Sequence, residues 1–289
     1  MRMTCKHFIL STIAASGASL ALAASASAGP PTGDYAQFNH CPQANATVTS
    51  CLYSEVTSGS FKLGTSTVPI TKKIVLQGGI GSDPNTFQTF FVNAVGADTL
   101  SKTGLDVPGG LLGIMQGTGF TGALLAAFEA AVHSANGVTA TAELVGPVQI
   151  NLINFLLGIQ PALTLPVRIH LENPFLGGSC YIGSSSTPVN LALTTGTTAP
   201  PAPNTPITGS TGSTTFSPDG NITIVSGFKL VNNSFAVPAA TGCGYWPFVP
   251  LITGAVNLKE GLPAAAGKNS ATLIGTQKLA IKASVIASE

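Results

Sequence analysis

The sequence predicts a mainly β protein, a β-sandwich or barrel-like domain with one or two helical insertions. Several segments alternate apolar and polar residues with a period of two, as strands with one buried face do. The 289 residues include 33 Gly and 20 Pro, which suits a chain with many turns. Regular alternation of strands with helices, which an α/β fold needs, is absent.

The clearest strand pattern lies in Leu163–Glu172, where two sets of residues alternate. The apolar set comprises Leu163, Leu165, Val167, Ile169 and Leu171; the other set comprises Thr164, Pro166, Arg168, His170 and Glu172. Segments 61–76, 138–152, 189–193, 222–224 and 273–281 are predicted to be further strands. Proline cannot donate to a ladder, so the strands with Pro147 and Pro166 should lie at an edge or carry a bulge.

Two segments have helical spacing. In 121–135, Leu124, Leu125, Phe128 and Val132 share one stripe, and Asn136-Gly137 is a suitable C-terminal cap. In 248–260, the apolar stripe would comprise Leu251, Ile252, Ala255 and Leu258.

The first 28 residues have the features of a signal peptide. A basic start with Arg2 and Lys6 precedes an apolar stretch, and Ala26-Ser27-Ala28 fits a cleavage site. We therefore expect a secreted or envelope-associated protein with no transmembrane segment after cleavage, and residues 29–289 as a single β-rich domain. The Pro/Gly/Ser/Thr-rich stretch 194–220 is predicted to be an exposed loop within this domain.

Four cysteines remain after cleavage: Cys41, Cys51, Cys180 and Cys243. An even number in an exported chain predicts two disulfides. Three pairings are possible, and sequence proximity favours Cys41–Cys51 with Cys180–Cys243. No C-x-x-C or paired Cys/His spacing indicates a metal site, so no metal is expected.

Charge is scarce: Asp, Glu, Lys and Arg make up 8% of the chain, against about 25% in average soluble domains. The net charge of +1 argues against a nucleic-acid partner, because neutralising phosphates requires excess Lys and Arg. The same scarcity leaves few groups for catalysis. No catalytic or cofactor-binding residue is predicted, and no cofactor.

Arg168, His170 and Glu172 form the first candidate polar site, since they share a strand face at spacings of about 7 Å. Such a row suits a carboxylate or a sugar, but it equally fits the solvated face of an amphipathic strand. Glu129 and His133 are spaced i, i+4, which a surface ion pair explains. Segment 117–122 matches G-x-G-x-x-G, but no βαβ context supports a dinucleotide site.

Trp246, the only tryptophan, stands near Cys243 and is interpreted as packing against a disulfide. No G-x-S-x-G motif is present, although a Ser-His-Asp triad assembled in space remains possible. The apolar segment 107–132 suits a helix buried against the sheet or lying on an apolar ligand.

Several short motifs resemble a group of secreted proteins of high-GC Gram-positive (actinobacterial) bacteria. They include Asn173-Pro174-Phe175-Leu176-Gly177, Cys180-Tyr181-Ile182-Gly183, Gly242-Cys243-Gly244 and Ala266-Gly267-Lys268-Asn269. The group has no assigned activity, so no functional residue carries over. The resemblance implies export, a two-disulfide frame and an envelope-associated role.

The sequence thus predicts a non-enzymatic surface, structural or binding protein whose partners are envelope components or an apolar ligand. The first alternative is a carrier of apolar ligands or lipids, with 107–132 and the second helix lining a cavity. The second is an extracellular hydrolase using His133 or His170. The oligomeric state has no signature in the sequence.

Overall fold

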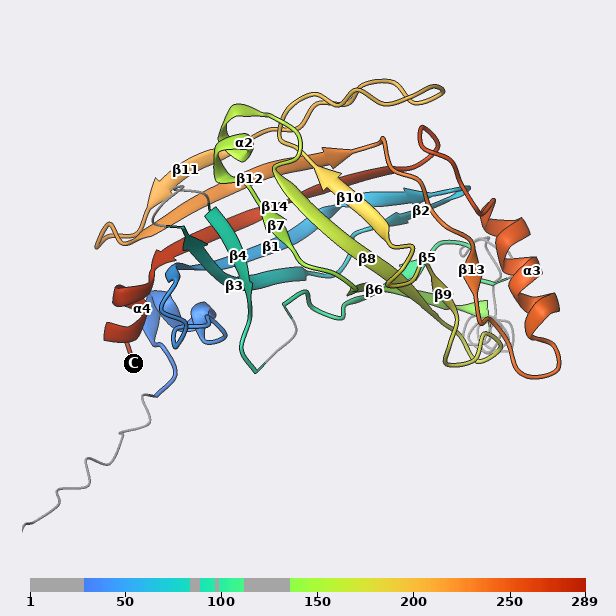
Figure 1. Ribbon diagram of the computed structural model, residues 1–289, viewed down its shortest axis with the longest axis horizontal. Coiled ribbons are helices and arrows are strands. Elements are labelled where there is room, and N and C mark those ends of the chain that lie inside the picture. The colour runs from blue at the N-terminus through green and yellow to red at the C-terminus, as the bar shows by residue number, and fades with distance from the viewer. Residues whose placement is uncertain (1–28, 84–88, 97–98, 112–135) are drawn as a thin grey trace, which may run out of the picture.

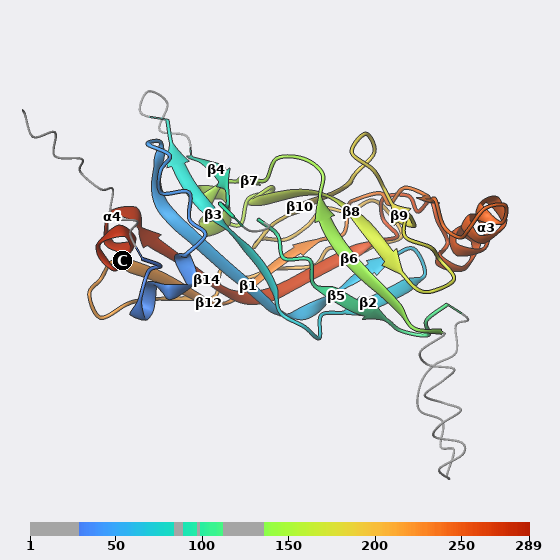
Figure 2. The same ribbon diagram turned by 90° about the horizontal axis from the view of Figure 1, so that it is seen from below.

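The chain folds into two antiparallel sheets packed face to face, the β-sandwich with helical insertions that the sequence predicts (Figure 1). The computed structural model describes residues 29–83, 89–96, 99–111 and 136–289. Viewed at 90°, the strands of both sheets run along the long axis of the molecule (Figure 2). Helices cover the ends of the sandwich.

The first sheet has the order β11-β12-β14-β1-β3-β4, with β2 paired to β1. Its strands are β1 (Val48–Leu63), β2 (Ser66–Pro69), β3 (Ile74–Ser82), β4 (Thr89–Asn93), β11 (Ser213–Phe216), β12 (Ile222–Asn232) and β14 (Ser270–Ile281). The segment 61–76, expected to be one strand, is instead divided among the end of β1, all of β2 and the start of β3. The first of these begins at Val48, in a Ser/Thr-rich stretch where the apolar alternation is weak.

The second sheet has the order β13-β9-β8-β6-β5, and β7 and β10 also pair with β8. Its strands are β5 (Gly104–Val107), β6 (Val138–Leu144), β7 (Gln149–Ile150), β8 (Leu163–Glu172), β9 (Tyr181–Ile182), β10 (Val189–Leu193) and β13 (Ala240–Thr241). The β8 strand has the predicted bounds, and its apolar set faces the core.

Pro166 lies in the centre of this sheet and explains why segment 138–152 is not one strand. β6 ends opposite Val167 and β7 begins opposite Thr164, so the partner strand is interrupted beside Pro166. The missing amide donor is therefore not needed there. Gly146 packs closely on the proline ring, where a Cβ atom would lie 2.9 Å from Cγ. β8 is thus not an edge strand, contrary to the expectation for Pro166; the interruption between β6 and β7, where Pro147 lies, takes the place of an edge. The segment ends in α2, a helix that the sequence did not predict.

Backbone hydrogen bonds also join the layers at their margins. Thr194 and Val231 exchange two such bonds, of 2.9 and 3.0 Å, and thereby connect the end of β10 to β12. Thr194 is fully buried. The predicted exposed loop 194–220 therefore starts inside the protein; its later part is mostly exposed and includes β11, whose four residues are all exposed.

Four helical segments complete the described chain: the 3-10 helix η1 (Gly33–Phe38), α2 (Leu152–Leu157), α3 (Val249–Glu260) and α4 (Lys282–Ala287). α3 confirms the second predicted helix; Pro250 stands in its first turn and Gly261, at φ +63°, ends it. η1 and α4 pack at one end of the sandwich and α3 at the other (Figure 1).

The main core fills the space between the sheets. A smaller cluster, formed by Phe38, Cys41, Val48, Cys51, Ile222, Ala280 and Val285, lies beneath η1 and α4. On β1, Cys51 belongs to this cluster while Val56 packs against the main core, so the two clusters lie on opposite faces of the sheet. Ile281, at the end of β14, belongs to neither cluster and is 49% exposed.

Both disulfides form with the pairing favoured by sequence proximity. Cys41–Cys51 joins the segment after η1 to β1, and Cys180–Cys243 joins the residue just before β9 to the segment after β13. All four cysteines are buried. Cys51 lies within β1.

The proposed signal peptide 1–28, the helix 121–135 with Glu129 and His133, and the glycine motif 117–122 lie outside the described residues. Within the described ranges, no helix is both long and apolar enough to cross a membrane.

Candidate functional site

The polar row of Arg168, His170 and Glu172 lies on the outer face of β8, between β6 and β9. The alternation of β8 dictates this, because the apolar residues of the opposite parity face the core. Arg168 and His170 are half-buried, and Glu172 is exposed. The row exists as predicted, and its neighbours decide what it can do.

Arg168 is held by two neighbours from adjacent strands. Its guanidinium lies 2.7 Å from a carboxylate oxygen of Glu143, the residue directly opposite on β6. Its Cζ also lies 4.1 Å from the ring centroid of Tyr181 on β9, a cation–π contact. Its charge is therefore already compensated within the protein.

His170 is packed in the same cluster. Its ring stacks on Tyr181 with centroids 4.5 Å apart, and Nδ1 lies 3.4 Å from Glu172 Oε1. Nε2 is buried and has no hydrogen-bond partner among the described residues. In that part of the chain, no Ser, Thr or Cys side chain bonds to His170, so the geometry offers it no nucleophile to activate.

Sequence reasoning missed Glu143 and Tyr181, which complete this cluster. Register brings them to β8, since Glu143 pairs with Arg168 and Tyr181 pairs with His170. The opposite charges of Glu143 and Arg168, each on a predicted strand, were the available signal. Among the described residues, no group of three or more His, Cys, Asp or Glu side chains could hold a metal ion.

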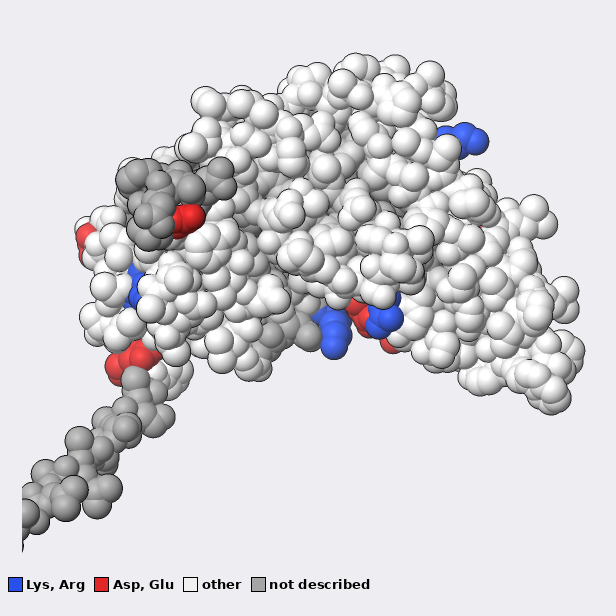
Figure 3. All heavy atoms as spheres, in the orientation of Figure 1, with Lys and Arg blue, Asp and Glu red and all other residues white. Residues whose placement is uncertain are grey.

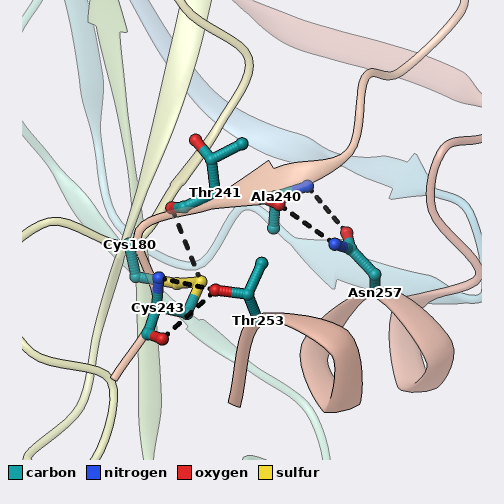
Figure 4. The surroundings of a disulfide bond; sticks show 6 residues. All are labelled: Cys180, Ala240, Thr241, Cys243, Thr253 and Asn257. Carbon is teal, nitrogen blue, oxygen red and sulfur yellow. Dashed lines mark hydrogen bonds between the residues drawn. A yellow bond between two sulfur atoms is a disulfide. The ribbon is translucent and has the colours of Figure 1, made fainter. Parts of the chain in front are cut away.

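A different surface emerges at the α3 end, because α3 presents polar side chains inward. Asn257 accepts a hydrogen bond from Ala240 N–H (2.7 Å) and donates to Ala240 C=O (3.0 Å). Thr253 likewise accepts from Cys243 N–H (3.1 Å) and donates to Cys243 C=O (3.2 Å; Figure 4). These bonds satisfy backbone groups along the segment that carries β13 and the disulfide.

The face of α3 that points away from the sheets is apolar and exposed. Leu251 and Leu258 are 69% and 85% exposed, which contradicts their predicted burial; Val256 and Ile252 pack inward instead. Trp246 is 89% exposed and does not pack on the disulfide as the sequence suggested. We define the apolar end surface as the exposed residues Phe175, Tyr245, Trp246, Phe248, Leu251 and Leu258.

The apolar end surface has few charges around it. Residues 230–258 contain no Lys, Arg, Asp or Glu. On the face drawn in the space-filling view, no charged side chain is visible over α3, whereas acidic groups are visible at the opposite end (Figure 3). The charged residues of α3, Lys259 and Glu260, follow Leu258 and pair with each other at 3.0 Å. Phe175 joins this surface because Gly244 N–H donates to Leu176 C=O (2.7 Å), which holds the two segments together.

Two hollows are also present. One is an apolar cavity of about 90 Å³ between the sheets, and the other is an open cleft of about 530 Å³ bordered by β4, β7 and α2. The carrier hypothesis expected the second predicted helix, now α3, to line a cavity. The inter-sheet cavity is instead lined by strands and by the segment before β5, and no α3 residue lines it. In the open cleft, Asn151 caps α2 and Asn154 donates to Pro161 C=O, so local structure occupies these amides.

Comparison with known proteins gives no relative: no family model, no curated protein and no solved structure matches the chain.

Proposed function

We propose that this protein is a non-enzymatic binding protein of the cell envelope that attaches to a lipid surface through the apolar end surface. The observation that carries the proposal is the exposure of its aromatic residues, above all the 89% exposure of Trp246. Water contact with so much apolar area is unfavourable, and burying it is the main driving force for association.

The extent of the surface supports a binding role. Its four aromatic side chains expose an area on the order of 500 Å², since each presents about 150–250 Å² when fully accessible. With the two leucines, the area exceeds the roughly 300–600 Å² of the largest patch on a typical monomer. Larger exposed patches mark interaction sites.

The chemistry of the surface favours lipid over a second protein copy. Tyr245 and Trp246 combine an apolar ring with a polar tip, a combination enriched where apolar and aqueous phases meet. Because 230–258 lacks charged side chains, insertion at the lipid interface requires no ion to lose its hydration. α3 lies at the extremity of the long axis, so this end can reach a flat surface without obstruction by the sheets (Figures 1 and 2).

Other features support a location outside the cytoplasm and a non-enzymatic role. Two buried disulfides fit a protein outside the cytoplasm, where thiols are oxidised. The charged groups of Arg168 and Glu143 are paired with each other rather than directed to a substrate. The signal-like segment and the sequence resemblance support an envelope location for the proposed role.

Trp246 provides the test, since it is the only tryptophan of the chain and its fluorescence reports on this surface alone. Mature protein titrated with neutral phosphatidylcholine vesicles should co-sediment with them and show a blue shift in emission. Because the surface carries no cations, raising the salt concentration should leave binding unchanged.

Leu258→Ser should weaken vesicle binding, while Phe216→Ser should not, because Phe216 is similarly apolar and 65% exposed but lies on β11. Both variants keep Trp246 as the reporter. Absence of sedimentation and of a blue shift would reject a lipid partner. A blue shift that depends on protein concentration without vesicles, with a doubled mass in light scattering, would assign the surface to a second copy.

A further inference from the structure

We infer that the cavity between the two sheets is a binding site for one small apolar molecule. The site is separate from the apolar end surface and does not depend on its function. It lies inside the sandwich, with walls supplied by β1, β2, β3, β12 and β14 of one sheet and β5, β6, β8 and β10 of the other.

The wall of this cavity is chemically uniform. Aliphatic and phenylalanine side chains form nearly all of it, and the only polar residues are Ser54, Ser101 and Thr103. Ser101 accepts from Val75 N–H (2.9 Å), and its hydroxyl bonds to that of Thr103 (2.8 Å), which donates to Lys73 C=O (2.9 Å). These two hydroxyls are used by the protein itself.

Water is therefore a poor occupant. A buried water needs about two to four polar partners, and beside the bonded Ser101 and Thr103 the described wall offers only the hydroxyl of Ser54. Apolar cavities of this kind stay dry, and an apolar guest gains contacts there without breaking hydrogen bonds.

The volume limits the guest. At about 90 Å³, the cavity is smaller than an apolar cavity of about 150 Å³ that takes benzene or xenon, and far below the roughly 300 Å³ at which ligand pockets begin. A whole lipid does not fit. A single xenon atom, or a hydrocarbon no larger than benzene after slight widening, has the matching size and chemistry.

The cause of the void lies in β6. Its inward residues at the cavity are Ala140 and Ala142, whereas the neighbouring β8 provides Leu165 and the facing sheet provides Phe228 and Leu273. Filling the void from β6 is thus the direct test. Ala142→Leu adds volume inside the cavity, and Ala192→Leu makes the same change on β10 at a position that does not line it.

We would measure saturable binding of xenon by ¹²⁹Xe NMR and of benzene by its effect on the melting temperature. Binding of either probe to the wild type and to Ala192→Leu, and its loss in Ala142→Leu, is the expected result. Ala140→Val, a smaller change in the same wall, should weaken binding if Ala142→Leu does not fold.

Binding of neither probe to the wild type, or binding that survives both cavity variants, would overturn the inference. Leu258→Ser separates this site from the apolar end surface: it should retain xenon and benzene binding while losing vesicle binding. Failure of one proposal is therefore distinguishable from failure of the other.

Discussion

The two ends of the sandwich are built alike and present opposite surfaces. Each end has a buried disulfide, and each is covered by helical segments: η1 and α4 at one end, and α3 at the other (Figure 1). The η1/α4 end is closed by polar contacts, including Tyr35 to Asp219 and Lys278 to Gln37. The α3 end uses its polar side chains inward and leaves apolar ones outside.

The difference shows that disulfides and helical covers do not determine what an end of a β-sandwich presents. At the η1/α4 end, apolar residues such as Phe38 and Val285 fill a small core over the sheet. At the α3 end, the backbone groups of Ala240 and Cys243 bond to the side chains of Asn257 and Thr253. Hydrogen bonding thus sets the rotation of α3 about its axis.

The largest contrast should come from removing each disulfide. Cys180 and Cys243 are 63 residues apart, and Cys41 and Cys51 are 10 apart. Because the loop entropy of the unfolded chain grows with loop length, Cys180→Ala with Cys243→Ala should lower the free energy of unfolding by about 4 kcal/mol, and Cys41→Ala with Cys51→Ala by about 3 kcal/mol. Denaturant unfolding measures both. A greater loss of unfolding free energy on removal of Cys41–Cys51 than on removal of Cys180–Cys243 would contradict this loop-entropy argument.

The next effect concerns the orientation of α3. Asn257→Ala removes both partners of the buried Ala240 backbone groups and should cost about 2–3 kcal/mol of unfolding free energy. Leu258→Ala, one position along, removes an exposed side chain and should change stability by less than about 0.5 kcal/mol. Equal losses for the two variants would show that the helix buries Leu258 in solution.

The smallest effect lies at the η1/α4 end and depends on pH. Hydrogen bonds from Ser217, Tyr35 and the backbone of Asn221 hold the pKa of Asp219 well below its usual range. A depressed pKa means that this contribution to stability is present at neutral pH and is lost as the pH falls below the ordinary carboxyl range. Asp219→Asn should therefore lower the melting temperature by about one or two degrees at pH 7, and the difference should shrink in acid.

Asp106→Asn is the matched control, since Asp106, on β5, makes an exposed ion pair with Lys72 at 3.2 Å. Surface pairs of this kind contribute little. A difference between wild type and Asp219→Asn that stays constant down to pH 2 would remove the linkage assigned to Asp219.

Much of the fold could be predicted because it depends on local patterns. The alternation in β8 fixed its bounds and its buried face, and cysteine spacing indicated the pairing. α2 was missed because its six residues are too few for a helical period to show. The polar row was predicted in part: its residues share a strand, but Glu143 and Tyr181 come from other strands.

The sequence by itself determined the class of fold, which residues of β8 face the core, and the pairing of the cysteines, since these depend on spacing along the chain. Only the tertiary structure decided which residues of α3 face water, because that choice rests on backbone groups of a distant strand. It also decided that Arg168 is neutralised and that Ala140 and Ala142 border a void. Neither feature could be predicted from the sequence, because each depends on how strands from different parts of the chain pair and pack.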